Sequence, residues 1–261
     1  MSRLLAVNFT SASQQARVCT EAWAQANLYC VKCESAQLRS TPPNTQAVDF
    51  TCDGCESVFQ LKSQSFPFGN RVTDSGYDAM CRAIESNRIP NLILVHYDRA
   101  EWSVKNAMLI PSFGFSLAAV EKRKPLSPTA RRAGWVGCNI LLSSIPSDLR
   151  VPLIADSQPI DAIAVRRQYR SMAVLQTLDV STRGWLIDVL NIARSLNKSE
   201  FSLGDMYSQD HYLSALHPRN KNVRPKIRQQ LQALRDLGML RFVGSGNYQW
   251  NTNIVDKLPI P

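Results

Sequence analysis

Two pairs of closely spaced cysteines limit most strongly what this chain can fold into. The pairs are Cys30-Val-Lys-Cys33 and Cys52-Asp-Gly-Cys55, with 18 residues between them. A spacing of two residues lets both thiolates of a pair converge on one metal ion, and two such pairs make a closed tetrahedral site. Unligated buried thiols are the alternative, and disulfides fit this spacing less well. The sequence therefore predicts one structural Zn²⁺ held by Cys30, Cys33, Cys52 and Cys55.

Length and composition indicate the class of protein. A chain of 261 residues, 44% of them hydrophobic, can bury one large core or a core with an appended domain. It has no run of about 18 apolar residues and no secretory signal pattern. We therefore expect a cytoplasmic protein with no membrane association, and we expect it to be a monomer.

The charge of the chain points to a polyanionic partner. The formal net charge is +9, and residues 181–261 alone carry 11 Lys and Arg against 6 Asp and Glu. A basic surface of this kind favours nucleic acid, although many basic proteins bind none. The concentration of positive charge at the carboxyl-terminal end predicts a DNA-binding domain there.

The first part of the chain mixes helical and strand patterns. Residues 11–26 and 76–87 have helical spacing, and the short segments AVDF and SVFQLK flank the second cysteine pair as strands. CDGC would then be the turn of an antiparallel hairpin. Two further apolar runs, NLILVHY and NAMLIPSF, have the length and composition of central strands. Residues 1–180 are thus expected to form a mixed α/β core with an embedded zinc ribbon.

Near residue 180 the pattern becomes helical. Ser181 can cap a first helix, a second short helix is expected at about 202–214, and a third has Pro225 near its start and Gly238 at its end. The following MLRFVGSGNYQW predicts strand, turn and strand. Three helices closed by a hairpin are typical of a winged helix, here residues 181–261. An ordinary helical domain with a terminal hairpin is the alternative.

A carboxylate, an amide and a lysine are expected at one place on the hairpin. Side chains alternate across a strand, so Gln60 and Lys62 share a face, which Asp49 can approach if AVDF pairs with that strand. The Asp49 carboxylate, the Gln60 amide oxygen and the Leu61 carbonyl are suitable oxygen ligands for Mg²⁺. Lys62 could orient or deprotonate an attacking water beside a phosphodiester. The pattern predicts Asp49, Gln60 and Lys62 as catalytic residues.

This arrangement resembles the catalytic core of PD-(D/E)XK nucleases. The chain resembles, almost from end to end, the DpnI-like methyl-directed (type IIM) restriction endonucleases of that superfamily. The segments that carry the resemblance are QQAR, TEAW, the two cysteine pairs, VDFTCDGCESVFQLKS, RKPLSPTARRAGWVGCNI, RGWLIDVLN and KIRQQLQALRD. The resemblance implies a Mg²⁺-dependent endonuclease that cuts double-stranded DNA containing N6-methyladenine, in the site G-m6A-T-C. It also implies a zinc knuckle inside the nuclease hairpin and a carboxyl-terminal winged helix.

The sequence departs from the superfamily pattern at two positions. Gln60 stands where a Glu is expected, and Val48 stands where the superfamily name places a Pro. A neutral amide attracts Mg²⁺ less than a carboxylate does. Glu21 could add an acidic group, or it could be a solvated helix residue. A methylation-dependent DNA-binding protein with a lapsed nuclease centre, and a zinc-ribbon and winged-helix regulator, are therefore the alternative functions.

Two basic segments are expected to contact DNA. Arg131, Arg132 and Trp135 lie on a Pro- and Gly-containing loop, where an aromatic ring can stack on a base or anchor the loop. The third carboxyl-terminal helix would present cations beside its apolar stripe and amide side chains suited to adenine edges. The candidate residues there are Asn220, Lys221, Asn222, Arg224 and Arg228.

Overall fold

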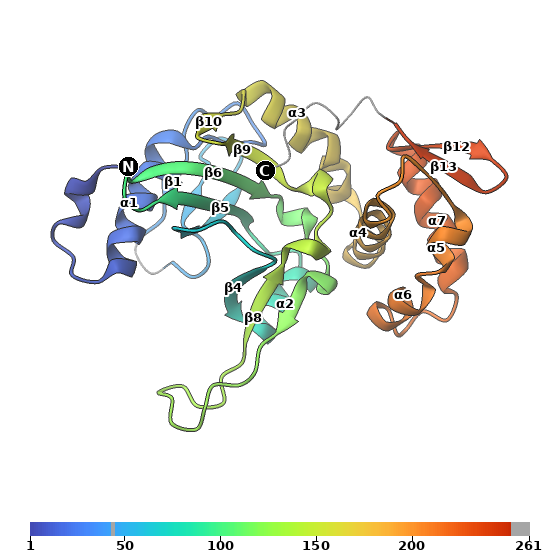
Figure 1. The fold of residues 1–261 in the computed structure, drawn as a ribbon, viewed down its shortest axis with the longest axis horizontal. Helices are drawn as coiled ribbons and strands as arrows, with labels where there is room; N and C mark the ends of the chain where they lie inside the picture. Colours follow the sequence, from blue (N-terminus) through green and yellow to red (C-terminus); the bar gives the residue numbers. More distant parts are fainter. Residues whose placement is uncertain (43–44, 252–261) are drawn as a thin grey trace.

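A computed structural model describes residues 1–42 and 45–251 of the chain. Its largest element is a seven-stranded sheet in the order β1-β2-β3-β5-β6-β9-β10 (Figure 1). No helix among the described residues is long and apolar enough to cross a membrane. The strands are β1 Arg39–Ser40, β2 Phe50–Thr51, β3 Val58–Gln64, β5 Asn91–Asp98, β6 Ser103–Ile110, β9 Val151–Ala155 and β10 Gln158–Pro159. The expected mixed α/β core is confirmed.

The hairpin and the central strands form as the sequence predicts. β2 and β3 pair antiparallel, with Phe50 opposite Phe59, and the second cysteine pair is the turn between them. β3 then pairs in parallel with β5, whose first five residues are buried. Helix α1 (Ala12–Asn27) packs on β3, where Thr20 Oγ1 lies 3.0 Å from Ser63 Oγ. The strand that carries Gln60 and Lys62 is therefore held on both edges and on one face.

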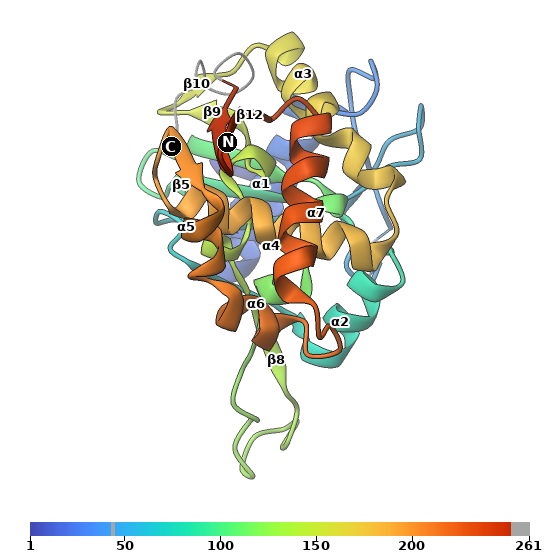
Figure 2. The ribbon, with the colours of Figure 1, turned by 90° about the vertical axis from the view of Figure 1, so that its right-hand side faces the viewer.

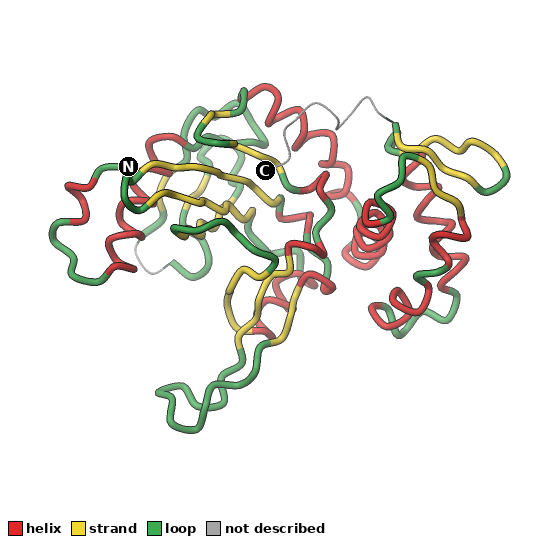
Figure 3. Tube along the Cα trace, in the orientation of Figure 1, coloured by secondary structure: helices red, strands yellow, loops and turns green. Residues whose placement is uncertain are grey.

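A second sheet carries a long exposed arm. Its strands are β4 (Arg71–Gly76), β8 (Gly137–Leu141) and β7 (Val120–Lys122), in that order, and α2 (Tyr77–Glu85) packs beside them. Between β7 and β8, residues 123–136 project away from the body of the molecule (Figures 1 and 2). Figure 3 shows this arm as loop throughout. It is the basic loop identified in the sequence.

The carboxyl-terminal part has the expected helices and hairpin. The helices are α4 Val180–Ser195, α5 Leu203–Tyr207, α6 Asp210–Leu216 and α7 Val223–Asp236, and the strands β11 Glu200–Ser202, β12 Leu240–Gly244 and β13 Asn247–Trp250 form one small sheet. The turn Gly244-Ser245-Gly246 has three successive positive φ angles, of 97°, 49° and 79°. Glycine adopts a positive φ without steric cost, which explains the two glycines of this turn.

Three details of this part differ from the sequence interpretation. Asp179, not Ser181, caps α4, because its carboxylate accepts the Thr182 N–H. The single helix expected at about 202–214 is two helices, separated by a turn at residues 208–209. α7 begins at Val223, so Asn220, Lys221 and Asn222, which were expected on this helix, lie before it.

Helix α3 (Ala162–Met172) and α4 connect the large sheet to the carboxyl-terminal helices, and α4 lies between the two (Figures 1 and 2). On the sheet side, the Arg194 guanidinium bonds the buried Asp148 carboxylate at 2.5 and 2.8 Å, and Ser116 Oγ donates to Asp188 at 2.6 Å. On the other side, His217 Nε2 lies 2.8 Å from the second Asp188 oxygen. The same helix therefore belongs to both packing units.

The Asp148–Arg194 pair should contribute measurably to stability. Replacing Asp148 by Ala should lower the free energy of unfolding by about 2–3 kcal/mol, because Arg194 would keep a half-buried charge without its partner. The matched control is Asp236→Ala, which removes an exposed ion pair with Arg235 at a cost of ~0–1 kcal/mol. Denaturant unfolding measures both changes. Equal losses in the two variants would contradict a structural role for Asp148.

Candidate functional site

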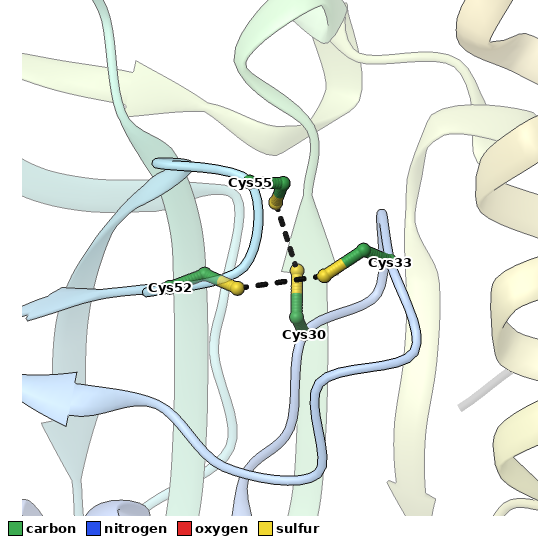
Figure 4. Close-up of side chains that lie close together, drawn as sticks. All are labelled: Cys30, Cys33, Cys52 and Cys55. Atoms are coloured by element: carbon green, nitrogen blue, oxygen red, sulfur yellow. Dashed lines mark hydrogen bonds between the residues drawn. The ribbon is translucent and has the colours of Figure 1, made fainter.

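The four predicted cysteines form a compact cluster. Their Sγ atoms all lie within 4.8 Å of one another, and the Cys30–Cys55 and Cys33–Cys52 distances are both 3.5 Å (Figure 4). Four thiolates at about 2.3 Å from one zinc ion would be about 3.8 Å apart, so the observed cluster fits a tetrahedral ion. The cluster is therefore compatible with a structural zinc site.

Local structure favours the thiolate form of one of these cysteines, Cys52, whereas burial raises the pKa of Cys30. Burial alone would raise the pKa of Cys52, but hydrogen bonds from Ser35, from Cys33 and from the backbone N–H groups of Gly54 and Cys55 lower it to about 6. Because the thiolate is the ligand form, a lowered pKa favours metal binding. A Cβ on Gly54 would lie 3.3 Å from Ser35 Oγ and 3.4 Å from Cys33 Sγ, so the two cysteine turns pack closely against each other at this position.

An arginine from a distant helix holds the first cysteine turn. Arg166 Nε, on α3, donates to the carbonyl oxygens of Cys30 and Cys33 at 3.1 and 3.0 Å, and its Nη2 donates to Ser35 at 3.4 Å. Its guanidinium also lies 4.9 Å from the ring centroid of Tyr29. No pattern in the sequence predicts this contact, because 136 residues separate Arg166 from Cys30.

Asp49 lies beside the edge of β3, immediately before β2 begins. Its N–H donates to the Phe59 carbonyl at 2.9 Å, and its Oδ2 accepts the Leu61 N–H at 2.7 Å. The N–H and C=O of one residue leave a strand on the same side, so the Leu61 carbonyl also faces the side of Asp49. Asp49 and Leu61 line a hollow of about 430 Å³ together with Arg17 and Glu21 of α1. A carboxylate and a carbonyl oxygen thus face the same space, a donor set that suits Mg²⁺.

Glu21 shares that hollow but already has a partner. Arg17 Nε donates to its carboxylate at 2.8 Å, one turn earlier on α1. Both side chains are partly exposed, so this pair is weak and can open. Glu21 therefore lies beside Asp49, as the sequence suggested for an additional acidic group. A metal ion in the hollow would have to compete with Arg17 for the Glu21 carboxylate.

The side chains of Gln60 and Lys62 meet a residue that the sequence interpretation missed. Lys62 Nζ lies 3.1 Å from Asp74 Oδ1, and Gln60 Nε2 lies 3.4 Å from the same oxygen. The Asp74 side chain is only 4% exposed, whereas that of Lys62 is 22% exposed. No spacing signal marks Asp74, because its approach depends on the pairing of β4 with β8. The structure thus divides the predicted group: Asp49 contacts the backbone of β3, and Gln60 and Lys62 contact Asp74.

The two arginines and the tryptophan of the arm lie in different surroundings. Arg131 and Arg132 are exposed, whereas Trp135 is half-buried near the base of the arm. A Cβ added to Gly137 would come within 2.8 Å of the Trp135 ring, and one added to Gly76 within 3.5 Å. The ring therefore packs across two glycines, as an anchor does, while the Arg132 guanidinium lies 4.7 Å from its centroid.

The start of α7 presents the second set of candidate DNA contacts. Lys221 and Asn222 are exposed in the turn before the helix, and Asn220 Oδ1 accepts the Asn222 N–H at 2.7 Å, so Asn220 shapes this turn. Arg224 bonds Asp210 at 2.9 Å. Arg228 Nε donates to the Tyr207 hydroxyl. Arg224 and Arg228 are therefore held by other side chains, whereas the side chains of Lys221 and Asn222 form no hydrogen bond with any residue that the structure describes.

The Arg166 contacts should affect metal retention. Arg166→Met keeps most of the side-chain volume but removes the donors that fix the Cys30–Cys33 turn, so zinc affinity should fall by roughly 10–100-fold. Arg167→Met, on the exposed side of α3, is the matched control. Zinc content by elemental analysis and the rate of zinc release to a chelator measure the effect. Wild-type protein without zinc would refute the zinc site, and equal release rates would refute the role of Arg166.

Comparison with protein-family models agrees with these features. Residues 1–178 match the DpnI model, described as the Dam-replacing family. Residues 181–250 match the DpnI carboxyl-terminal model, described as the Dam-replacing HTH domain. The first match alone spans more than half of the chain and includes the four cysteines, Asp49 and Lys62. The resemblance found in the sequence is confirmed, and the chain belongs to the DpnI, or Dam-replacing, family.

Proposed function

We propose that this protein is a Mg²⁺-dependent endonuclease that cleaves double-stranded DNA containing N6-methyladenine, in the site G-m6A-T-C. The observation that carries the proposal is the hairpin of β2 and β3. It holds the Asp49 carboxylate 2.7 Å from the Leu61 N–H, with Lys62 next along the strand and the cysteine cluster at the turn. Membership of the DpnI family supports methylation-dependent cleavage as the activity of this hairpin.

Each residue of the hairpin has a chemical role in this proposal. Asp49, the Leu61 carbonyl and the Gln60 amide oxygen would hold Mg²⁺, which when bound polarises the phosphate and lowers the pKa of a bound water. Lys62 lies on the same strand and would orient the attacking water and offset the negative charge that develops on the phosphate. The cysteine cluster has four protein ligands and no open position, so its zinc would be structural.

Recognition of the methyl group is assigned to two separate elements. An adenine N6-methyl projects into the major groove, and burying one methyl contributes only about 1 kcal/mol. Strong discrimination between methylated and unmethylated DNA therefore requires that the methylated site be recognised by two separate contacts. We propose that the arm carrying Trp135 makes one of them, and that the Asn220–Lys221–Asn222 turn with Arg224 and Arg228 makes the other.

Gln60 favours a second candidate function. In this alternative, with an amide in place of the usual carboxylate, the centre would be catalytically inactive, and the protein would bind methylated DNA without cutting it. Mn²⁺ separates the two possibilities, because it accepts nitrogen and oxygen ligands more readily than Mg²⁺ and can support a weakened centre. Tight specific binding without cleavage in either metal would favour the lapsed nuclease.

The first test of the proposal removes the charged groups of the hairpin. Asp49→Ala and Lys62→Ala should each abolish detectable cleavage, because one loses a metal ligand and the other loses the cation beside the phosphate. Binding to a methylated duplex in Ca²⁺ should stay within about threefold of wild type, since neither residue is assigned to a base. Plasmid digestion and fluorescence anisotropy measure the two properties.

Matched variants control for charge and folding. Asp53→Ala removes a carboxylate that is exposed in the second cysteine turn, and Lys105→Ala removes a lysine on β6 that pairs with Glu101. Both should cleave as wild type does. Full cleavage by Asp49→Ala would place the active centre elsewhere in the molecule.

The second test separates the two roles considered for Trp135. If the ring reads the methyl group, Trp135→Ala should lower the ratio of affinities for methylated and unmethylated duplexes by about 5–10-fold, a loss on the order of 1 kcal/mol. The double variant Arg131→Ala with Arg132→Ala should instead weaken both duplexes equally and reduce the salt slope by about one per charge. Titrations of both duplexes at several salt concentrations in Ca²⁺ measure these effects. An unchanged ratio in Trp135→Ala would show that the ring only anchors the arm.

A further inference from the structure

Asp74 occupies a position at the candidate centre that neither the motif nor the family match assigns. Its Oδ1 accepts from Lys62 Nζ at 3.1 Å, from Gln60 Nε2 at 3.4 Å and from the Ser75 N–H at 2.7 Å. One carboxylate oxygen therefore contacts both side chains of β3 that are proposed to act on the substrate. Because the Asp74 side chain is almost fully buried, these contacts are little screened by solvent.

A bulge in β4 brings Asp74 to this place. β4 and β8 pair regularly through Thr73 and Asn139, and the register then shifts before Gly76 pairs with Gly137. Asp74 and Ser75 lie in that irregularity, which is the kind of feature that redirects a side chain beside a functional site. The carboxylate is thereby turned to the face of β3 that carries Gln60 and Lys62.

The buried thiol of Cys138, which lies near Asp74, adds no charge to the centre. Burial, followed by the negative charge of Asp74, raises the pKa of Cys138 to about 11, so this thiol is neutral at physiological pH. Asp74 and Lys62 are then the opposite charges at this spot. With Asp49, the centre has two carboxylates and one lysine, the same formal charge as a centre with Asp, Glu and Lys.

A side-chain amide has a donor end and an acceptor end, and Asp74 can take only the donor end. When Gln60 Nε2 faces Asp74, the Gln60 Oε1 faces away from it. A glutamate at position 60 would instead place two acceptors against each other. Gln60 and Asp74 are thus complementary, which gives a physical reason for an amide where the superfamily has a carboxylate.

We propose that Asp74 is a positioning residue of the nuclease centre, which fixes the Gln60 amide and the Lys62 ammonium in their working orientations. This inference rests on the proposed endonuclease function. It explains how a neutral amide would serve as a metal ligand. The negative charge that a Glu at position 60 would supply is supplied instead by Asp74, which accepts a hydrogen bond from the Gln60 amide. Asp74 itself touches neither substrate nor metal in this role.

A double-mutant cycle in the full-length protein tests the inference. Asp74→Asn in the wild-type background should lower kcat on a methylated duplex by on the order of 100-fold with little change in KM, because misplaced groups still allow binding. In the Gln60→Glu background the same change should cost much less, because the amide introduced by Asp74→Asn can donate to the new carboxylate. The double variant should be at least about tenfold more active than the product of the two single effects. Equal fold-changes in both backgrounds would overturn the proposal.

Asp78→Asn is the matched control, four residues further along on the exposed side of α2. It should retain the wild-type kcat. An Asp74→Asn variant with the same kcat as Asp78→Asn would also overturn the proposal. Thermal unfolding of each variant shows whether a loss of activity reflects a loss of folding.

A readout that needs no cleavage separates this proposal from the proposed function. In protein labelled with ¹⁵N-glutamine, the Gln60 side-chain signal is identified by its absence in Gln60→Glu. Asp74→Asn should shift this signal and speed its proton exchange, and Mn²⁺ should broaden it at lower concentration in wild type than in Asp74→Asn. If these results hold but wild type cuts no methylated DNA in Mg²⁺ or Mn²⁺, the endonuclease function fails and the positioning role stands. If Asp74→Asn leaves the signal and its broadening unchanged, the positioning role fails.

Discussion

The convergence of four thiols holds together the part of the molecule on which the candidate centre depends. β2 has only two residues, Phe50 and Thr51, and a pairing this short is marginal by itself. The cysteine cluster closes the turn at one end of that pairing, and the Asp49 carboxylate bonds the Leu61 N–H at the other. Burial raises the pKa of Cys30, so metal binding would displace protons and couple the folding of this hairpin to pH and to metal supply.

Features that depend on neighbouring residues in the chain could be predicted from the sequence. The cysteine spacing, the hairpin around the second pair and the terminal hairpin are all local patterns, and each is confirmed by the structure. The helical character of the carboxyl-terminal part is confirmed as well, although one of its three expected helices is two short ones. The helix ends were less predictable. Asp179 and Ser181 are both good caps two residues apart, and only the backbone conformation decides between them.

Features that depend on tertiary contacts could not be predicted. Asp74 reaches Lys62 only because β4 departs from regular pairing, and no local signal in the sequence specifies a bulge there. Arg166 reaches the cysteine turn from another helix. Trp135 was placed on its basic loop correctly, but its packing across Gly76 and Gly137 depends on two strands that are distant in sequence. In each case the residue type was visible and its partner was not.

Helix α4 has a consequence for how DNA can be engaged. It packs on the sheet and on the carboxyl-terminal helices at once, through the Arg194–Asp148 pair on one side and the Asp188–His217 contact on the other, so it connects these two parts of the molecule directly. A rigid connection makes the second contact effectively intramolecular, at a high local concentration, but only for one geometry. B-DNA turns by about 34–36° per base pair, since ~10–10.5 pairs make one turn. If the arm and the start of α7 both contact methylated DNA as proposed, two methylated sites on one duplex would engage both elements only at particular helical phases, and the protein would respond to the spacing of the sites as well as to their sequence.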